Sequence, residues 1–217
     1  MKNDRINADT VMALKENPFH AISLAARYDD QGFHLNLITR ECIEHDDIVS
    51  LLSRWRKENE FWFQAIFPVS DAGTKIWLKN KVIEEKDRLL FLVTINNAYI
   101  GHVGLWKFDF AESSCEIDNI VRGEHDYPGI MYNSIVVLQD WARTTLAIQD
   151  FYLHTLIENH RAVKLYKKLG YETIKTEPLI KTINGDRIEW VPPPADFAGD
   201  IERHEMQMRL MNTYRGA

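Results

Sequence analysis

The chain has 217 residues, 45% of them hydrophobic, which suits one domain with additions or two small domains. Its net charge of −6 argues against a nucleic-acid partner, and no apolar run approaches the roughly 20 residues of a membrane span. The N-terminus leads into no signal-peptide core, and two cysteines provide no disulfide framework. We therefore predict a cytoplasmic protein with neither a nucleic-acid nor a membrane partner.

The first 33 residues carry no motif, and we expect them to form an N-terminal extension. The remaining residues, 34–217, are predicted to form a single domain. Within the extension, Asn17-Pro18 favours a break in the chain. Residues 21–28, which follow this break, are interpreted as a short helix.

Four segments follow in the next part of the chain. Residues 33–37 alternate between apolar and polar, which predicts a first strand that ends near Arg40. Residues 44–59 and 71–85 carry apolar residues at helical spacing and predict two helices. Between these helices, residues 61–68 are rich in aromatic side chains and end in proline. We interpret this aromatic run first as core or helix packing.

Three strands are predicted next. Residues 89–95 form a continuous apolar run, Asn96-Asn97 is a turn dipeptide, and residues 99–108 continue as a second strand. Residues 115–121 alternate between polar and apolar, as in a half-buried strand. Short connections of this kind predict an antiparallel meander.

A loop and a helix come directly after the third of these strands. The loop covers residues 122–129, and residues 130–147 carry one apolar stripe at helical spacing. The first turn of a helix has backbone N–H groups without intrahelical partners, and such an end attracts phosphate. Pro128 presets the turn, while Gly129 would allow a ligand to approach the backbone closely. The loop is therefore a candidate anion-binding segment.

The next strand and helix carry the most specific signal in the chain. Residues 151–157 are a β-prone run. In the helix that follows, Asn159 is a good N-cap and Gly170 stands where a helix would end. Two strands joined by a helix imply parallel neighbours with a right-handed crossover, so the sheet is expected to be mixed.

The C-terminal part, residues 177–217, is predicted to be an extended strand region. It follows a strand over residues 171–176 and contains a turn at residues 183–187. Residues 204–210 alternate between apolar and polar, which indicates a closing strand at a half-exposed sheet edge. The methionines of this strand are interpreted as core filler.

The string Asn159-x-x-Ala-x-x-Leu-Tyr166-x-x-Leu-Gly170-Tyr resembles the signature helix of the GNAT superfamily of N-acetyltransferases, which use acetyl-CoA. The resemblance covers roughly residues 35–176. It implies an α/β fold (α+β by some schemes), with a central mixed, mostly antiparallel twisted sheet and helices on both faces. It also implies that the chain is an acetyl-CoA-dependent N-acetyltransferase.

In the family, acetyl-CoA lies where two adjacent parallel strands splay apart, and the resemblance carries its contacts onto this chain. The backbones of Ile120 and Val121 would pair with the pantetheine amides, and Asn159 and Tyr166 would also contact the cofactor. The amides implied to hold the pyrophosphate are those of Gly129, Ile130, Met131 and Tyr132.

The pyrophosphate loop departs from the family pattern. Asp126, Gly129 and Met131 stand at its three characteristic positions, so that only the central glycine is kept. Backbone donors do not depend on side-chain identity, so we expect binding to persist, although an acid near a pyrophosphate is unfavourable. Basic side chains could compensate for that acid, or they could simply form solvated surfaces. These basic residues are Arg122, His125, Arg161, Lys164 and Lys168.

Tyr166 is the predicted general acid, because the family uses a tyrosine at this motif position to protonate the departing CoA thiolate. A phenol with a pKa near ~10 is suited to that transfer. An acceptor amine must also lose a proton before it attacks, and three candidates for the base are, in order, Glu116, His154 and Asp118. Glu116 and Asp118 share one face of their strand. His154 stands at the position where ribosomal-protein N-terminal acetyltransferases, a group of the superfamily that this chain resembles, carry a base.

The predicted acceptor is the primary amine of a small molecule, with an amino sugar as one candidate. Trp62, Phe63 and Trp106 could line its pocket, since the family places the acceptor near this region. The alternatives are N-terminal acetylation of a protein, and a catalytically silent acyl-CoA-binding or regulatory domain. We predict no metal ion, and exposed edge strands together with the long tail are compatible with a homodimer.

Overall fold

The computed structural model describes residues 6–211, which divide into two compact units. Unit 1 comprises residues 6–55 and 70–151, and unit 2 comprises residues 56–69 and 152–211. The predicted boundary between an N-terminal extension and a single domain at residue 34 remains a prediction.

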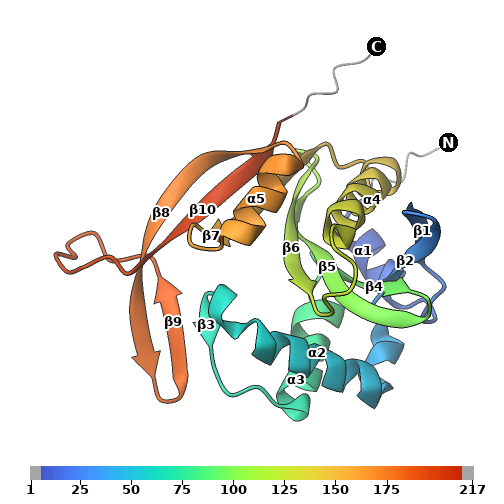
Figure 1. Ribbon diagram of the computed structural model, residues 1–217, viewed down its shortest axis with the longest axis horizontal. Coiled ribbons are helices and arrows are strands. Elements are labelled where there is room, and N and C mark those ends of the chain that lie inside the picture. The colour runs from blue at the N-terminus through green and yellow to red at the C-terminus, as the bar shows by residue number, and fades with distance from the viewer. Residues whose placement is uncertain (1–5, 212–217) are drawn as a thin grey trace. The chain divides into compact units, whose positions relative to one another are not determined.

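Unit 1 contains a sheet of antiparallel strands in the order β1-β2-β4-β5-β6 (Figure 1). These strands are β1 (Ser23–Tyr28), β2 (Gln31–Leu37), β4 (Arg88–Ile95), β5 (Ala98–Asp109) and β6 (Ser114–Arg122). The meander predicted for β4, β5 and β6 is confirmed. Its first turn is the Asn96-Asn97 dipeptide, whose φ angles of 49° and 62° lie in the left-handed region that asparagine tolerates.

The short helix predicted over residues 21–28 is wrong, because this segment forms the edge strand β1. Its exposure alternates between exposed and half-buried residues, and every residue from Ser23 to Tyr28 pairs with β2. Pairing with a neighbouring strand has outweighed a weak local helical preference. The helix of this region lies earlier, at α1 (Ala8–Lys15), where the Asn7 side chain accepts hydrogen bonds from the amides of the first turn.

Helices cover both faces of the unit 1 sheet. On one face, Phe91 of β4 meets Trp141 of α4 (Ile130–Thr145) edge to face, with ring centroids 5.3 Å apart. Leu90 and Leu92 point to the opposite face by the two-residue period of a strand, and they are fully buried as well. The other helical segments of this unit begin with the 3₁₀ turn η1 (Arg40–Glu44). They continue with α2 (Asp46–Glu58), α3 (Asp71–Trp77) and the π-helical turn η3 (Leu78–Ile83), close to the ranges predicted.

Unit 2 is a second set of antiparallel strands, in the order β7-β10-β8-β9-β3 (Figure 1). They are β7 (Asp150–Leu156, in this unit from residue 152), β10 (Arg203–Leu210), β8 (Tyr171–Asn184), β9 (Arg187–Val191) and β3 (Ala65–Ile66). The predicted turn at residues 183–187 is confirmed as the β8–β9 hairpin, with Gly185 at a φ of 58°.

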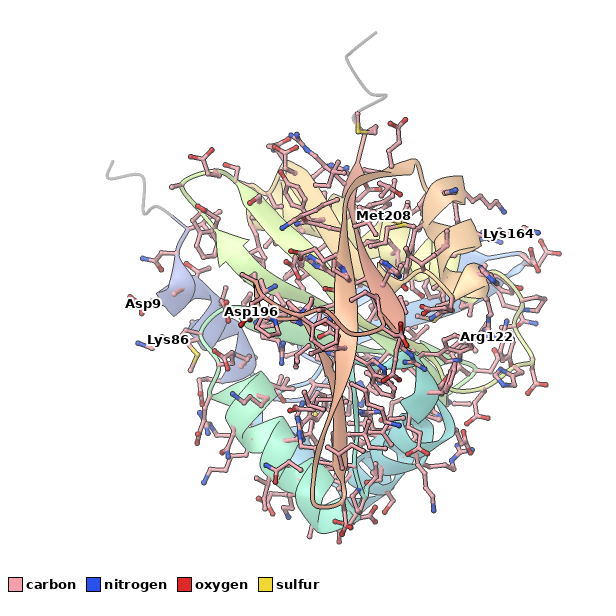
Figure 2. The ribbon with its side chains drawn as sticks, turned by 90° about the vertical axis from the view of Figure 1, so that its left-hand side faces the viewer. Asp9, Lys86, Arg122, Lys164, Asp196 and Met208 are labelled. Carbon is pink, nitrogen blue, oxygen red and sulfur yellow. The ribbon has the colours of Figure 1, made fainter. Side chains whose placement is uncertain are left out.

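The prediction that residues 204–210 close a half-exposed sheet edge is wrong. This strand, β10, pairs with β7 on one side and β8 on the other, so it lies inside the sheet. Alternation along a strand indicates which residues face the core but not how many strands flank it, and the partners here are distant in sequence. Met208, labelled in Figure 2, is fully buried, as expected for core filler.

The aromatic run of residues 61–68 does not form the core of unit 2. Phe61 and Trp62 lie on a short 3₁₀ turn with exposed fractions of 54% and 42%, so the packing interpretation is wrong for these two. Phe63 is half-buried beneath the Arg56 guanidinium, whose carbon lies 3.8 Å from the ring centroid. The buried cluster consists instead of Leu156, Leu179 and Trp190, with Ile66 and Ile188 packed against it.

Candidate cofactor and catalytic site

The residues predicted for the site fall in both units. Unit 1 holds the candidate carboxylates of β6, the strand segment predicted to bind pantetheine and the start of α4: Glu116, Asp118, Ile120, Val121, Gly129, Ile130, Met131 and Tyr132. Unit 2 holds the residues of β7 and of the signature helix α5 (His160–Lys168): His154, Asn159 and Tyr166.

A β-bulge in β6 includes Ile120, the first of the two residues predicted to bind pantetheine. The pairing of β5 with β6 slips between His102 and Gly104, so that Asn119 and Ile120 oppose a single residue of β5. Asn119 has a φ of 49°, in the left-handed region. Such a bulge bends the strand and redirects the backbone groups at and after it. Ile120 lies in the bulge and Val121 directly follows it.

His102 holds the bulge in place. Its ring nitrogen Nδ1 lies 2.7 Å from the carbonyl oxygen of Asn119 and donates a hydrogen bond to it. Burial lowers the pKa of His102 to about 4, although the bond to Asn119 opposes this effect, so the ring is neutral near pH 7. The ring of the buried Trp55 lies beside it, at 6.1 Å between centroids.

The start of α4 offers backbone donors without partners. Gly129 precedes the helix with a φ of 93°, and no side chain caps it. The amides of Ile130 and Tyr132 donate to the carbonyls of Tyr127 and Gly129, respectively. Among residues 6–211, no acceptor is found for the amides of Gly129 and Met131. A Cβ placed on Gly129 would meet no atom within 4 Å, so the space beside it is open in unit 1.

The two basic residues predicted near this loop contact each other. Arg122 Nη2 lies 3.2 Å from Nδ1 of His125, which accepts the hydrogen bond when the ring is neutral. Figure 2 labels Arg122, at the end of β6. Asp126, the acid that departs from the family pattern, is exposed. Solvent therefore reduces the cost of its charge near an anion.

Gly123 brings the start of the loop against the ring of Trp55. The amides of Gly123 and Glu124 both donate to the carbonyl of Ile100, at 2.9 Å each. A Cβ on Gly123 would lie 1.9 Å from Cε2 of Trp55, and this ring is fully buried. Only glycine allows the loop to approach this closely.

Replacing Gly123 with alanine is expected to destabilise the protein by about 1–3 kcal/mol, because a buried ring cannot move away from the new methyl group without strain. Urea unfolding followed by circular dichroism measures this change. Gly32→Ala is the matched control, since a Cβ there meets no atom within 4 Å. Equal stability of the two variants would contradict the close approach of the loop to Trp55.

The two carboxylates of β6 both lie beside cations. Glu116 pairs with Lys107 at 2.9 Å, and Asp118 pairs with Arg88 at 3.3 Å. Both cations also lie over the ring of Trp106, at 4.5 Å for Lys107 and 4.1 Å for Arg88. Burial raises the pKa of the Asp118 carboxyl, and the Arg88 guanidinium opposes this rise. Either carboxylate would act as a base from within an ion pair.

The signature helix α5 has the ends predicted for it. Asn159 caps the helix, accepting a hydrogen bond from the amide of Ala162 at 3.2 Å, and Gly170 follows the helix with a φ of 91°. Tyr166 is the buried residue of this helix, with 5% of its surface exposed. Its ring lies 6.4 Å from that of Tyr171, measured between centroids.

The remaining candidates of unit 2 lie on β7 and on the outer side of α5. His154 is half-buried in the middle of β7, opposite Gln207 of β10. Arg161, Lys164 and Lys168 are exposed. Figure 2 shows the Lys164 side chain pointing away from the helix. This exposure is compatible with a solvated surface and with phosphate contacts, so both interpretations stay open.

A family model described as "Acetyltransferase (GNAT) domain" matches residues 36–172. The chain belongs to the GNAT acetyltransferase family. Among curated relatives, the spermidine N(1)-acetyltransferase of Vibrio cholerae serotype O1 is 25% identical over 136 residues, 62% of this chain and 78% of that protein. The enzyme of Escherichia coli K12 is 25% identical over 126 residues, 58% of this chain and 63% of that protein.

Solved structures of the family share the fold. A RimL ribosomal L7/L12 α-N-protein acetyltransferase has a TM-score of 0.64 at 9% identity, covering 89% of this chain and 97% of that one. The Vibrio cholerae spermidine N-acetyltransferase in complex with CoA and spermine has a TM-score of 0.55 at 21% identity, covering 82% and 94%. The predicted α/β GNAT-like fold, with its mixed sheet, is confirmed.

Family membership also confirms the predicted activity class. The chain is an acetyl-CoA-dependent N-acetyltransferase, with acetyl-CoA as its co-substrate. Among residues 6–211, no three or more His, Cys, Asp or Glu side chains gather where they could hold a metal ion. No helix within the same range is long and apolar enough to span a membrane. The roles of the individual site residues remain predictions.

Proposed function

We propose that this GNAT enzyme acetylates a primary amine of a small molecule, and that a polyamine such as spermidine is the first acceptor class. The observation that carries the proposal is the sequence match to two bacterial spermidine N(1)-acetyltransferases. A net charge of −6 is consistent with a polycationic acceptor, since opposite charge favours encounter. None of the relatives described above is named for an amino sugar, so that part of the prediction has no support from them.

In this proposal, the backbone of unit 1 holds acetyl-CoA. The unpaired amides of Gly129 and Met131, at the positive end of the α4 dipole, suit an anionic pyrophosphate. The open space beside Gly129 would allow a phosphate to reach them. Ile120, in the bulge of β6, and Val121, directly after it, would pair with the pantetheine amides.

The proposed reaction is direct attack in a ternary complex. A base accepts a proton from the substrate ammonium, and the amine nitrogen then attacks the thioester carbonyl. The C–S bond breaks as the amide forms, and Tyr166 donates its phenolic proton to the departing thiolate. Glu116, His154 and Asp118, in that order, remain the candidate bases. The raised pKa of Asp118 would make it a stronger base than an ordinary carboxylate.

One relative of this chain forms an oligomer. A structure of the Vibrio cholerae spermidine N-acetyltransferase is described as dodecameric. For the present chain, the homodimer predicted from its edge strands remains a proposal.

Thermal unfolding with and without acetyl-CoA tests the cofactor site first. At ~100 times the dissociation constant, the ligand adds about 2.7 kcal/mol. For a chain of this size, that should raise the unfolding midpoint by roughly 5–11 °C. No shift at millimolar acetyl-CoA would mean that the altered loop has lost the cofactor.

Release of the CoA thiol in the presence of different amines then tests the acceptor class. Spermidine, a free amino sugar and a peptide with a free N-terminus are compared at equal concentration, with a reaction lacking amine as the control. The greatest release is expected with spermidine. Release with the peptide alone would replace the proposal by N-terminal acetylation, whereas cofactor binding without release from any amine would indicate a silent acyl-CoA-binding domain.

A further inference from the structure

Residues outside both the signature helix and the pyrophosphate loop hold the two ends of the loop, residues 123–129. At its first end, the Glu124 carboxylate accepts a hydrogen bond from Trp55 Nε1 at 3.1 Å and forms an ion pair with Arg54. Both partners belong to α2. This end is therefore held by side chains in addition to the backbone bonds to Ile100.

At its second end, the loop is held by the N-terminal edge strand. The hydroxyl of Tyr28, the last residue of β1, donates a hydrogen bond of 2.6 Å to the carbonyl oxygen of Pro128. The Tyr28 ring also meets Tyr127 edge to face, with centroids 6.3 Å apart. All of these residues lie in unit 1.

The Pro128 carbonyl belongs to the same peptide group as the Gly129 amide. A trans peptide group is planar, so its C=O and N–H point in opposite directions. A hydrogen bond that fixes the carbonyl therefore also fixes the direction of the N–H. It also polarises the peptide, which makes the N–H a stronger donor. The amide fixed in this way, that of Gly129, is one of the two amides at the start of α4 for which no acceptor is found among residues 6–211.

We propose that Tyr28 is a positioning residue for acetyl-CoA, which orients the Gly129 amide toward the pyrophosphate through the Pro128 carbonyl. Glu124 secures the opposite end of the same loop. This inference rests on the proposed cofactor site. It assigns a role in cofactor binding to β1, which lies outside the region matched by the family model.

The test is the Tyr28→Phe variant, which keeps the ring and removes the hydroxyl. The KM for acetyl-CoA is expected to rise roughly 3- to 10-fold, as for the loss of one good hydrogen bond, while kcat changes less than about twofold. S-acetylpantetheine, which lacks the pyrophosphate, should be used equally well by the variant and the wild type. Tyr127→Phe is the matched control, because it keeps the ring that meets Tyr28 and removes a neighbouring hydroxyl for which no hydrogen bond is found among residues 6–211.

Three results would overturn the inference. They are an unchanged KM for acetyl-CoA in Tyr28→Phe, an equal loss with S-acetylpantetheine, and an equal loss in Tyr127→Phe. Hydrogen exchange without cofactor separates this inference from the proposed function. Tyr28→Phe should accelerate exchange of the hydrogen-bonded amides of Ile130 and Tyr132 even if no acetyl-CoA binds, and unaltered exchange would show that Tyr28 does not hold the loop.

Discussion

Replacing Tyr166 with phenylalanine is expected to lower kcat by about 100-fold or more, the range found when a general acid is lost. The phenol is the proposed proton donor to the CoA thiolate, and phenylalanine keeps the ring without the proton. Because phenylalanine fills nearly the same volume, the substitution leaves the packing of this buried side chain largely unchanged. The affinity for acetyl-CoA should therefore change little, and steady-state kinetics together with calorimetric titration would measure both quantities.

Tyr171→Phe is the matched control for Tyr166→Phe. Both rings are buried and lie 6.4 Å apart, so a general effect of removing a buried hydroxyl would appear in both variants. A rate loss confined to Tyr166→Phe supports the role in proton transfer. An unchanged kcat in Tyr166→Phe would show that another group protonates the thiolate.

The second large effect concerns the stability of the protein in mild acid. Burial lowers the pKa of His102 from 6.5 to about 4, so the unfolded chain binds a proton in this range that the folded chain does not. The contribution of His102 to stability is therefore present above pH 6.5 and is lost as the pH falls. The loss attributable to this residue should reach about 3 kcal/mol by pH 4.

The His102→Asn variant isolates this contribution. Asparagine can keep a donor to the Asn119 carbonyl but does not titrate, so its unfolding free energy should fall less steeply between pH 6.5 and 4. Urea unfolding at several pH values measures both slopes, and the other ionisable groups are common to the two proteins. Parallel slopes would mean that His102 is not held neutral by burial.

Local patterns were enough to predict most of the fold. The strands β4, β5 and β6 and the helix α5 carry period, turn and cap signals within a few residues of one another. The errors arose where distant partners decide the outcome. Residues 23–28 form a strand because β2 lies beside them, and β10 lies inside its sheet because β7 and β8 flank it. Neither arrangement leaves a signal within the segment itself.

For the candidate site, too, local signals could be read from the sequence, whereas contacts between distant residues could not. Tyr166 and Gly129 could be proposed as site residues because they stand in or near a recognisable string, and Asn159 because it precedes a helix. Tyr28 and His102 were missed, since each is a single residue far along the chain from the group that it contacts. A lone aromatic or histidine residue in a strand has many ordinary uses, and only the folded chain shows which carbonyl it meets.

The edge position of β1 has a consequence for any shortened form of this protein. Phe33, Leu35 and Leu37 of β2 are fully buried, and β1 pairs along the free side of that strand. A chain trimmed to residues 36–172, the extent of the family match, would lose Tyr28, all of β1 and residues 31–35 of β2. The apolar strand β4 would then keep an outer partner only at Phe91 and Leu92. Unpaired backbone groups on an apolar strand recruit other chains, so the trimmed protein would tend to aggregate even though it kept the signature helix and the pyrophosphate loop.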